Sequence, residues 1–246
     1  MRLSGFGRRS ALLLTFALVP ILAGCGSNPF NPPIDPGGDG HLPGDTPIND
    51  SQQNLMIRFE KSYEFQDLQA YQYLLTSDFR YTFSLASDPR LVDQYPNWGL
   101  DDEIQSTEHL FDGFTNTRGE FFAAASQIQM SLIGVQYTGD FTHADSASHY
   151  QKVIVTTVDM QIEVPNPGAD PIVYNINARH EFYIVRGDAA VLQAGQEARS
   201  DRWYIRKWDD LSPPPPAAIA RLSSLTSGGV QRTPATWGAV KDTFIR

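Results

Sequence analysis

The segment Tyr150–Val164, with the sequence YQKVIVTTVDMQIEV, decides the fold class of this chain. Apolar and polar residues alternate along it, and a period of two indicates a β-strand with one buried face. We expect one face of this strand to carry Ile154, Thr156, Val158, Met160, Ile162 and Val164. The segment therefore predicts a sheet of long strands.

Three neighbouring segments complete the predicted sheet. Residues 172–186 alternate in the same way after the turn-rich loop 165–171, and they place Ile176, Ala178, His180, Phe182 and Ile184 on one face. Residues 127–137 alternate and then slip around Gly134, which predicts a β-bulge there. Residues 201–211 are expected to close the sheet.

The segments before the sheet are predicted to be mainly helical. Asp50-Ser51 can cap a helix over 52–64, and Asp67 can cap a second one within 67–79. A half-buried strand over 79–85 and a loop over 88–99 are expected next. Residues 100–111 then predict a helix whose first turn is acidic, as the helix dipole favours. Helices followed by long antiparallel strands define an α+β domain.

Three stretches carry a resemblance to a known family: YQYLLTSDFRYTF, WGLDDEI and RWYIRKWDD. Their order and aromatic residues resemble nuclear transport factor 2-like (NTF2-like) domains, a group with SnoaL-like cyclases and ketosteroid isomerase. The resemblance spans about residues 52–210. It implies a cystatin-like cone, in which a curved antiparallel sheet packs against N-terminal helices and the open end forms a pocket.

The N-terminus carries the pattern of a secretory signal. Three arginines without an acid precede the apolar run 11–23, and Leu22-Ala23-Gly24-Cys25 follows. This LAGC stretch resembles the lipobox of bacterial lipoproteins, which implies cleavage before Cys25 and lipid attachment to it. Gly26 and Ser27 then favour the outer membrane. Cys25 is the single cysteine of the chain, so the mature monomer forms no disulfide.

Composition divides the chain into four parts. Residues 1–24 are the predicted signal peptide, and 25–50 are a disordered tether rich in Pro and Gly. Residues 51–211 form the expected domain, and 212–246 form a proline-rich linker and a short amphipathic helix. Thr236 can cap this helix, whose apolar residues are Trp237, Val240, Phe244 and Ile245. The formal net charge is −9 and becomes −12 without residues 1–24, which argues against nucleic acid as a partner.

Enzymes of this family place an acid, a base or a hydrogen-bond donor inside the cone. His180 is predicted to point inward and Tyr81 to do so from the first strand, while Asp78 precedes that strand. A lone inward histidine is more often a hydrogen-bonded core residue, and Tyr81 is more often a packing residue. These three are catalytic candidates only. The candidate pocket residues are His109, Trp203, Phe182 and Met160.

His143, Asp145 and His149 match no standard metal signature, and no phosphate loop, dinucleotide fingerprint or nucleophile elbow occurs. We therefore expect neither a metal nor a cofactor.

Three functions fit the sequence. The first is a lipid-anchored envelope protein that binds a small apolar ligand or a protein partner without catalysis. The second is a SnoaL-like or isomerase-like enzyme that uses His180 with Tyr81 or Asp78. The third is a structural envelope component that dimerises through its sheet face.

Replacing Cys25 tests the lipidation site. Cys25→Ser should abolish lipidation and normal processing, because the thiol is the atom that would carry the lipid. Mass spectrometry of the N-terminal peptide and membrane fractionation measure both. Normal cleavage with unchanged membrane retention would contradict the lipobox interpretation.

Overall fold

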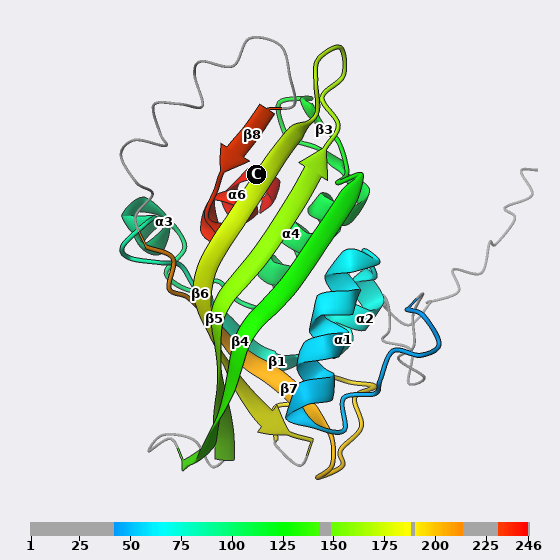
Figure 1. The fold of residues 1–246 in the computed structure, drawn as a ribbon, viewed down its shortest axis with the longest axis vertical. Coiled ribbons are helices and arrows are strands. Elements are labelled where there is room, and N and C mark those ends of the chain that lie inside the picture. The colour runs from blue at the N-terminus through cyan, green and yellow to red at the C-terminus, as the bar shows by residue number, and fades with distance from the viewer. Residues whose placement is uncertain (1–41, 143–148, 188–189, 214–230, 246) are drawn as a thin grey trace, which may run out of the picture. The chain divides into compact units, whose positions relative to one another are not determined.

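The computed structural model describes residues 42–142, 149–187, 190–213 and 231–245 (Figure 1). The chain divides into two units, residues 1–32 and 33–246, and the described residues all belong to the second. The predicted signal peptide, Cys25 and most of the predicted tether lie outside the described residues. Within the described part, no helix is long and apolar enough to span a membrane.

A curved sheet forms one layer of the domain. Its strands follow the order β1-β7-β6-β5-β4, and β8 also pairs with β6. The bounds are β1 Leu75–Thr82, β4 Gln127–Thr142, β5 His149–Val164, β6 Ile172–Arg186, β7 Trp203–Asp210 and β8 Gln231–Pro234. The strands from β4 to β7 are antiparallel, whereas β1 pairs with β7 and β8 pairs with β6 in parallel. The α+β class is confirmed, and the sheet is mixed instead of purely antiparallel.

Helices lie against this sheet (Figure 1). Their bounds are α1 Gln52–Glu64, α2 Leu68–Tyr73, α3 Pro89–Gln94, α4 Leu100–Asp112 and α6 Trp237–Ile245, with a small hairpin of β2 Phe114–Thr115 and β3 Phe121–Phe122. Both predicted caps are confirmed, because Ser51 accepts a hydrogen bond from the Asn54 N–H and Asp67 accepts one from the Ala70 N–H. The packed chain already includes Asn49, whose side chain is buried and donates to the Trp203 carbonyl.

Two predicted boundaries were wrong. The second helix ends at Tyr73 and the strand begins at Leu75, because pairing with Ile205 of β7 fixes the backbone there. The segment 88–99 contains α3 where a loop was predicted. Pro89 stands at the start of α3, where its fixed φ suits a helix and its missing N–H costs no bond.

The predicted bulge at Gly134 was also wrong. The pairing of β4 with β5 continues across Gly134, whose φ of 66° favours glycine, and a β-carbon there would lie 2.8 Å from the Thr156 hydroxyl oxygen. The bulge lies in β5, between Val155 and Val158. An extra residue there exchanges the two faces, so Val153 and Val155 are buried in place of the predicted Ile154 and Thr156.

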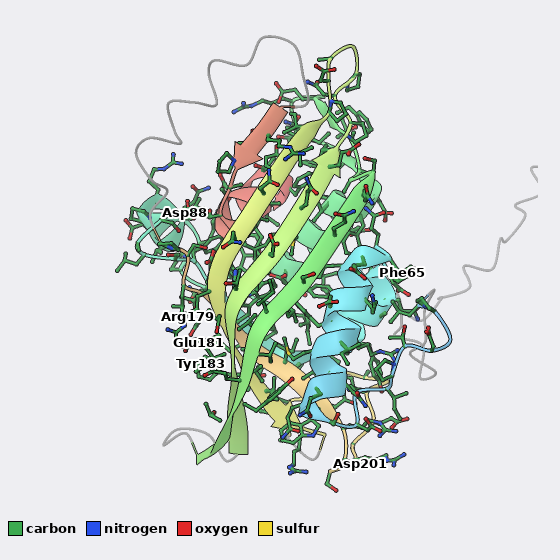
Figure 2. All side chains as sticks on the ribbon, viewed as in Figure 1. Phe65, Asp88, Arg179, Glu181, Tyr183 and Asp201 are labelled. Atoms are coloured by element: carbon green, nitrogen blue, oxygen red, sulfur yellow. The ribbon has the colours of Figure 1, made fainter. Side chains whose placement is uncertain are left out.

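A second register shift in the sheet places Trp208 at the centre of the core. The register between β6 and β7 shifts by one residue opposite Tyr183 and Ile184, which leaves Arg206 as the extra residue of β7. The shift turns Trp208 inward, where its ring lies 5.1–5.4 Å from those of Phe59, Tyr81 and Phe182. On the opposite face of β6, Arg179, Glu181 and Tyr183 project from the sheet (Figure 2).

The C-terminal helix α6 belongs to the same core. Thr236 caps it by accepting a hydrogen bond from the Ala239 N–H, as the sequence predicted. Trp237, Val240 and Phe244 are buried, and the Trp237 ring stacks 5.8 Å from that of Trp208. The strand β8, which the sequence did not predict, brings the chain back along β6 to this helix.

Candidate functional site

A buried ion pair joins α4 to α6 in the interior. Lys241 lies on the face of α6 that also carries Trp237 and Phe244, so burying that face buries the ammonium group. Its Nζ donates a hydrogen bond to Oε1 of Glu103, and both side chains are almost fully buried, with 1% and 0% exposed. The pair thus holds the C-terminal helix inside the fold.

Glu103 and Lys241 are enclosed by aromatic side chains. The Tyr71 hydroxyl donates to Glu103 Oε1 at 2.5 Å, and the Trp98 indole N–H donates to Oε2 at 2.9 Å. The ammonium lies 4.7–5.8 Å from the ring centres of four residues: Tyr81, Trp98, Trp208 and Trp237. Burial lowers the pKa of Lys241, while Glu103 and the rings favour its charged form.

A second carboxylate, Asp210, lies at the start of α6. It accepts hydrogen bonds from the Tyr81 hydroxyl at 3.1 Å, from the Ser212 N–H and hydroxyl, and from the Gly238 N–H at 3.4 Å. Burial, and then the charge of Asp210, raise the pKa of Tyr81 well above its ordinary value. The Tyr81 hydroxyl therefore stays protonated and serves as a donor.

His180 is fully buried beside this network. Its Nδ1 accepts a hydrogen bond of 2.8 Å from the Trp208 indole N–H, which places the ring proton on Nε2. Nε2 is buried and has no hydrogen-bond partner among the described residues. Burial lowers the pKa of His180 to about 4, so the ring is neutral at physiological pH.

The structure brings two of the three catalytic candidates into this interior and leaves the third outside. Tyr81 contacts Asp210, and His180 contacts Trp208, on which the Tyr81 ring also packs. Asp78 is one-third exposed and forms an ion pair of 2.7 Å with Arg206.

The four candidate pocket residues are packed against other side chains. His109 Nδ1 lies 2.6 Å from the Phe244 carbonyl oxygen, and its ring stacks on Phe114. Trp203 is covered by the Arg186 guanidinium at 4.5 Å. Phe182 and Met160 are buried in the hydrophobic core. None of the four lines the cavity described next.

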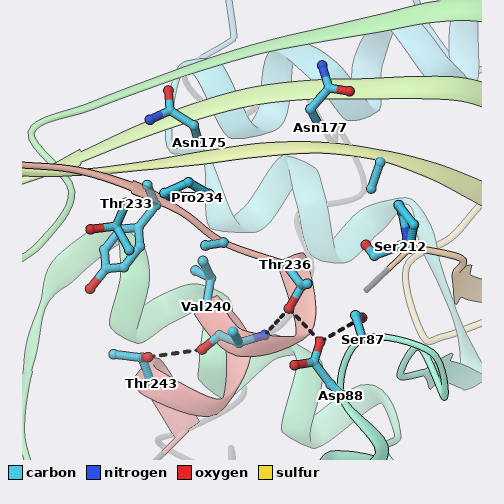
Figure 3. Close-up of a pocket in the computed structure, with 15 residues that line it drawn as sticks. Ser87, Asp88, Asn175, Asn177, Ser212, Thr233, Pro234, Thr236, Val240 and Thr243 are labelled. Atoms are coloured by element: carbon cyan, nitrogen blue, oxygen red, sulfur yellow. Dashed lines mark hydrogen bonds between the residues drawn. The ribbon is translucent and has the colours of Figure 1, made fainter. Parts of the chain in front are cut away.

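A cavity of about 410 Å³ opens at the edge of the sheet, between β6, β8, α6 and the start of α3 (Figure 3). This volume is in the usual range for small-molecule sites. Among the described lining residues, Asp88 is the single ionisable acid or base apart from the Tyr174 phenol, and its Oδ2 accepts hydrogen bonds from Ser87 and Thr236. Alanine, proline and valine side chains form much of the remaining wall: Ala178, Pro213, Pro234, Ala235, Ala239 and Val240.

The sequence analysis missed the residues that organise the interior. Lys241 gave one signal, because it stands at helical spacing from Trp237 and Phe244 on a face predicted to be apolar. Glu103 was predicted only as one of the acids in the first turn of its helix, and the bulge at Arg206, which turns Trp208 inward, leaves no signal in the sequence.

Metal ligands do not gather in the described part of the chain, where no group of three His, Cys, Asp or Glu residues occurs. His143 and Asp145 lie outside the described residues, as does the side chain of His149.

No known family profile and no curated protein sequence matches this chain. Among solved structures, it is similar to a candidate aromatic ring hydroxylase from Novosphingobium aromaticivorans, with 12% identity, a TM-score of 0.41, and coverage of 66% of this chain and 87% of that one. Two NTF2-like proteins are also similar. One, from Rhodospirillum rubrum, is of unknown function in nutrient uptake and has 10% identity and a TM-score of 0.34. The other, from Cytophaga hutchinsonii, has 9% identity and a TM-score of 0.30. Each comparison covers 66% of this chain and 98% of the other. Likeness at these scores says nothing about activity.

Breaking the buried ion pair should strongly destabilise the fold. Lys241→Met leaves the Glu103 carboxylate buried without its cation and should cost about 3–5 kcal/mol of unfolding free energy. The double variant Lys241→Met/Glu103→Gln should recover part of that loss, because a neutral amide still accepts from Trp98. Denaturant unfolding measures both variants.

Lys61→Met is the matched control, because Lys61 pairs with Glu64 at a partly exposed site and should change stability by less than about 1 kcal/mol. A loss in Lys241→Met as small as that of the control would contradict the structural role of the buried pair.

His180 should make stability fall as the solution is acidified. Its pKa is about 4 in the folded protein and about 6.5 in the unfolded chain, so below pH 6.5 the unfolded chain binds the extra proton. Between pH 7 and pH 5, the wild-type protein should lose about 2 kcal/mol more stability than His180→Gln, which keeps an acceptor for Trp208. Equal pH dependence of the two proteins, measured by denaturant unfolding, would show that His180 does not titrate in this way.

Proposed function

We propose that this chain is a lipid-anchored protein of the bacterial cell envelope, whose domain binds a small ligand with an apolar body in the cavity between β6, β8 and α6. The observation that carries the proposal is the contrast between two regions. The interior of the domain is filled by Trp208, Trp237 and Lys241, whereas the edge cavity is open and lined largely by small apolar groups.

The N-terminal sequence supports the envelope location. The basic start, the apolar run and the LAGC stretch together have the order of a lipoprotein signal. Gly26 and Ser27 favour the outer membrane. The segment rich in Pro and Gly up to residue 50 would hold the domain away from the lipid surface.

The geometry favours binding over catalysis. A general base must reach the proton that it removes, within about 3 Å or through one water. His180 and Glu103 are 0% exposed, and neither lines the cavity. Asp88 does line it, and its Oδ2 accepts hydrogen bonds from the hydroxyl groups of Ser87 and Thr236. The cavity therefore offers shape and apolar contact to a ligand, and Asp88 is the one carboxylate among its described lining residues.

Native mass spectrometry of the full-length protein, purified in detergent from its own membranes, tests this function. We expect the wild-type protein to retain a small molecule. The variant Ala239→Leu should lose it, because the larger side chain fills the cavity from α6. The matched control Ala169→Leu, at an exposed turn that does not line the cavity, should retain it.

Melting curves of both variants establish that the fold is intact. The same retained mass in Ala239→Leu and in the wild type, or a wild-type protein that carries no small molecule, would contradict the proposed function. Retention of a protein partner in place of a small molecule would do the same.

A further inference from the structure

The cavity lies at an interruption in the pairing of β6. On its outer edge, β6 pairs with β8 as far as Asn175 opposite Pro234, and with β7 from His180 opposite Asp210. The strand β8 ends at Pro234, and the Ala235 N–H makes the last printed bond from this segment to β6, to the Asn175 carbonyl. The edge of β6 between Asn175 and His180 therefore has no paired strand residue among those that the structure describes.

The peptide group of Asn177 faces this interruption. The Asn175 carbonyl accepts from the Ala235 N–H, and the Arg179 carbonyl accepts from the Leu211 N–H, both at 3.0 Å. Peptide groups of alternate residues point to the same edge of a strand, so the N–H and C=O of Asn177 point there too. Asn177 and Ala178 both line the cavity.

The remaining wall restricts the charge of a ligand. Among the described residues, no lysine, arginine or histidine lines the cavity, and Oδ2 of Asp88 accepts hydrogen bonds from Ser87 and Thr236. The first turn of α6 is already satisfied as well, because Asp210 and Thr236 accept its N–H groups. An anion would find no opposite charge among the described lining residues, and a cation would meet a single carboxylate, whose Oδ2 already accepts from two hydroxyl groups.

We propose that the ligand is an uncharged, short peptide-like molecule that adds one extended residue to the edge of β6. The N–H and C=O of that residue pair with the C=O and N–H of Asn177, and its small apolar side chain or end group enters the cavity. The recognition is β-augmentation limited to a single residue. The open edge spans Ile176 to Arg179, which at about 3.3 Å per residue is too short for a full strand. This inference rests on the proposed function.

Titration of the isotope-labelled full chain with matched probes tests it. N-acetyl-L-alanine N-methylamide should shift the amide signals of Asn177 and Ala178. Its analogue O-acetyl-L-lactic acid N-methylamide has an ester oxygen in place of one N–H and should bind about three- to tenfold more weakly, because one hydrogen bond is lost. The anion N-acetyl-L-alanine should bind more weakly still.

Two variants separate the contributions of backbone and cavity. Asn177→Ala keeps the peptide group and should preserve the preference for amide over ester. Ala239→Leu should abolish binding of the amide probe, and Ala169→Leu should not.

The possible results distinguish a failure of the peptide-like ligand from a failure of the proposed function. Equal affinity for amide and ester, or no binding of the amide probe by a protein that retains a small molecule in native mass spectrometry, overturns the peptide-like ligand and leaves the proposed function in place. Unchanged binding of the amide probe by Ala239→Leu shows that the cavity is not the site, which overturns both.

Discussion

The buried ion pair between Lys241 and Glu103 determines how the interior of this domain is packed. Two charges are removed from water, and they are stable there only because each has several partners. Glu103 accepts from Tyr71 and Trp98, and Lys241 lies among four aromatic rings. Because Lys241 must lie beside Glu103, α6 packs onto α4. Side chains of α6 then fill the interior space that a cone-shaped fold could leave for a ligand.

The same arrangement explains why the open cavity lies at the sheet edge. The chain returns to α6 along β8, which ends at Pro234, and β7 ends at Asp210. Between these two ends, the edge of β6 has no paired strand residue among those that the structure describes, and Ala178, Ala239 and Val240 lie around it. The same course of the chain through β8 and α6 therefore fills the interior and leaves the cavity at the edge of β6.

Much of the fold could be predicted because it depends on local patterns. Alternation in 150–164 and 172–186 indicated long strands, and Ser51, Asp67 and Thr236 gave the helix starts. The candidate site was predicted only in part. His180 and Tyr81 point inward, as expected. His180, however, is 0% exposed and its Nδ1 accepts a hydrogen bond from Trp208, so a ligand in the cavity cannot reach it.

The sequence by itself determined the residue types that make strands, caps and the lipobox-like signal, because each depends on neighbours within a few positions. Only the tertiary structure decided which residues face the core beyond the bulges in β5 and β7, since a single extra residue exchanges the two faces of a strand. It also decided that Lys241 is buried, because its counter-charge Glu103 lies 138 positions away in the chain. The cavity beside Asn177 arises in the same way, from four segments that meet only when the chain is folded.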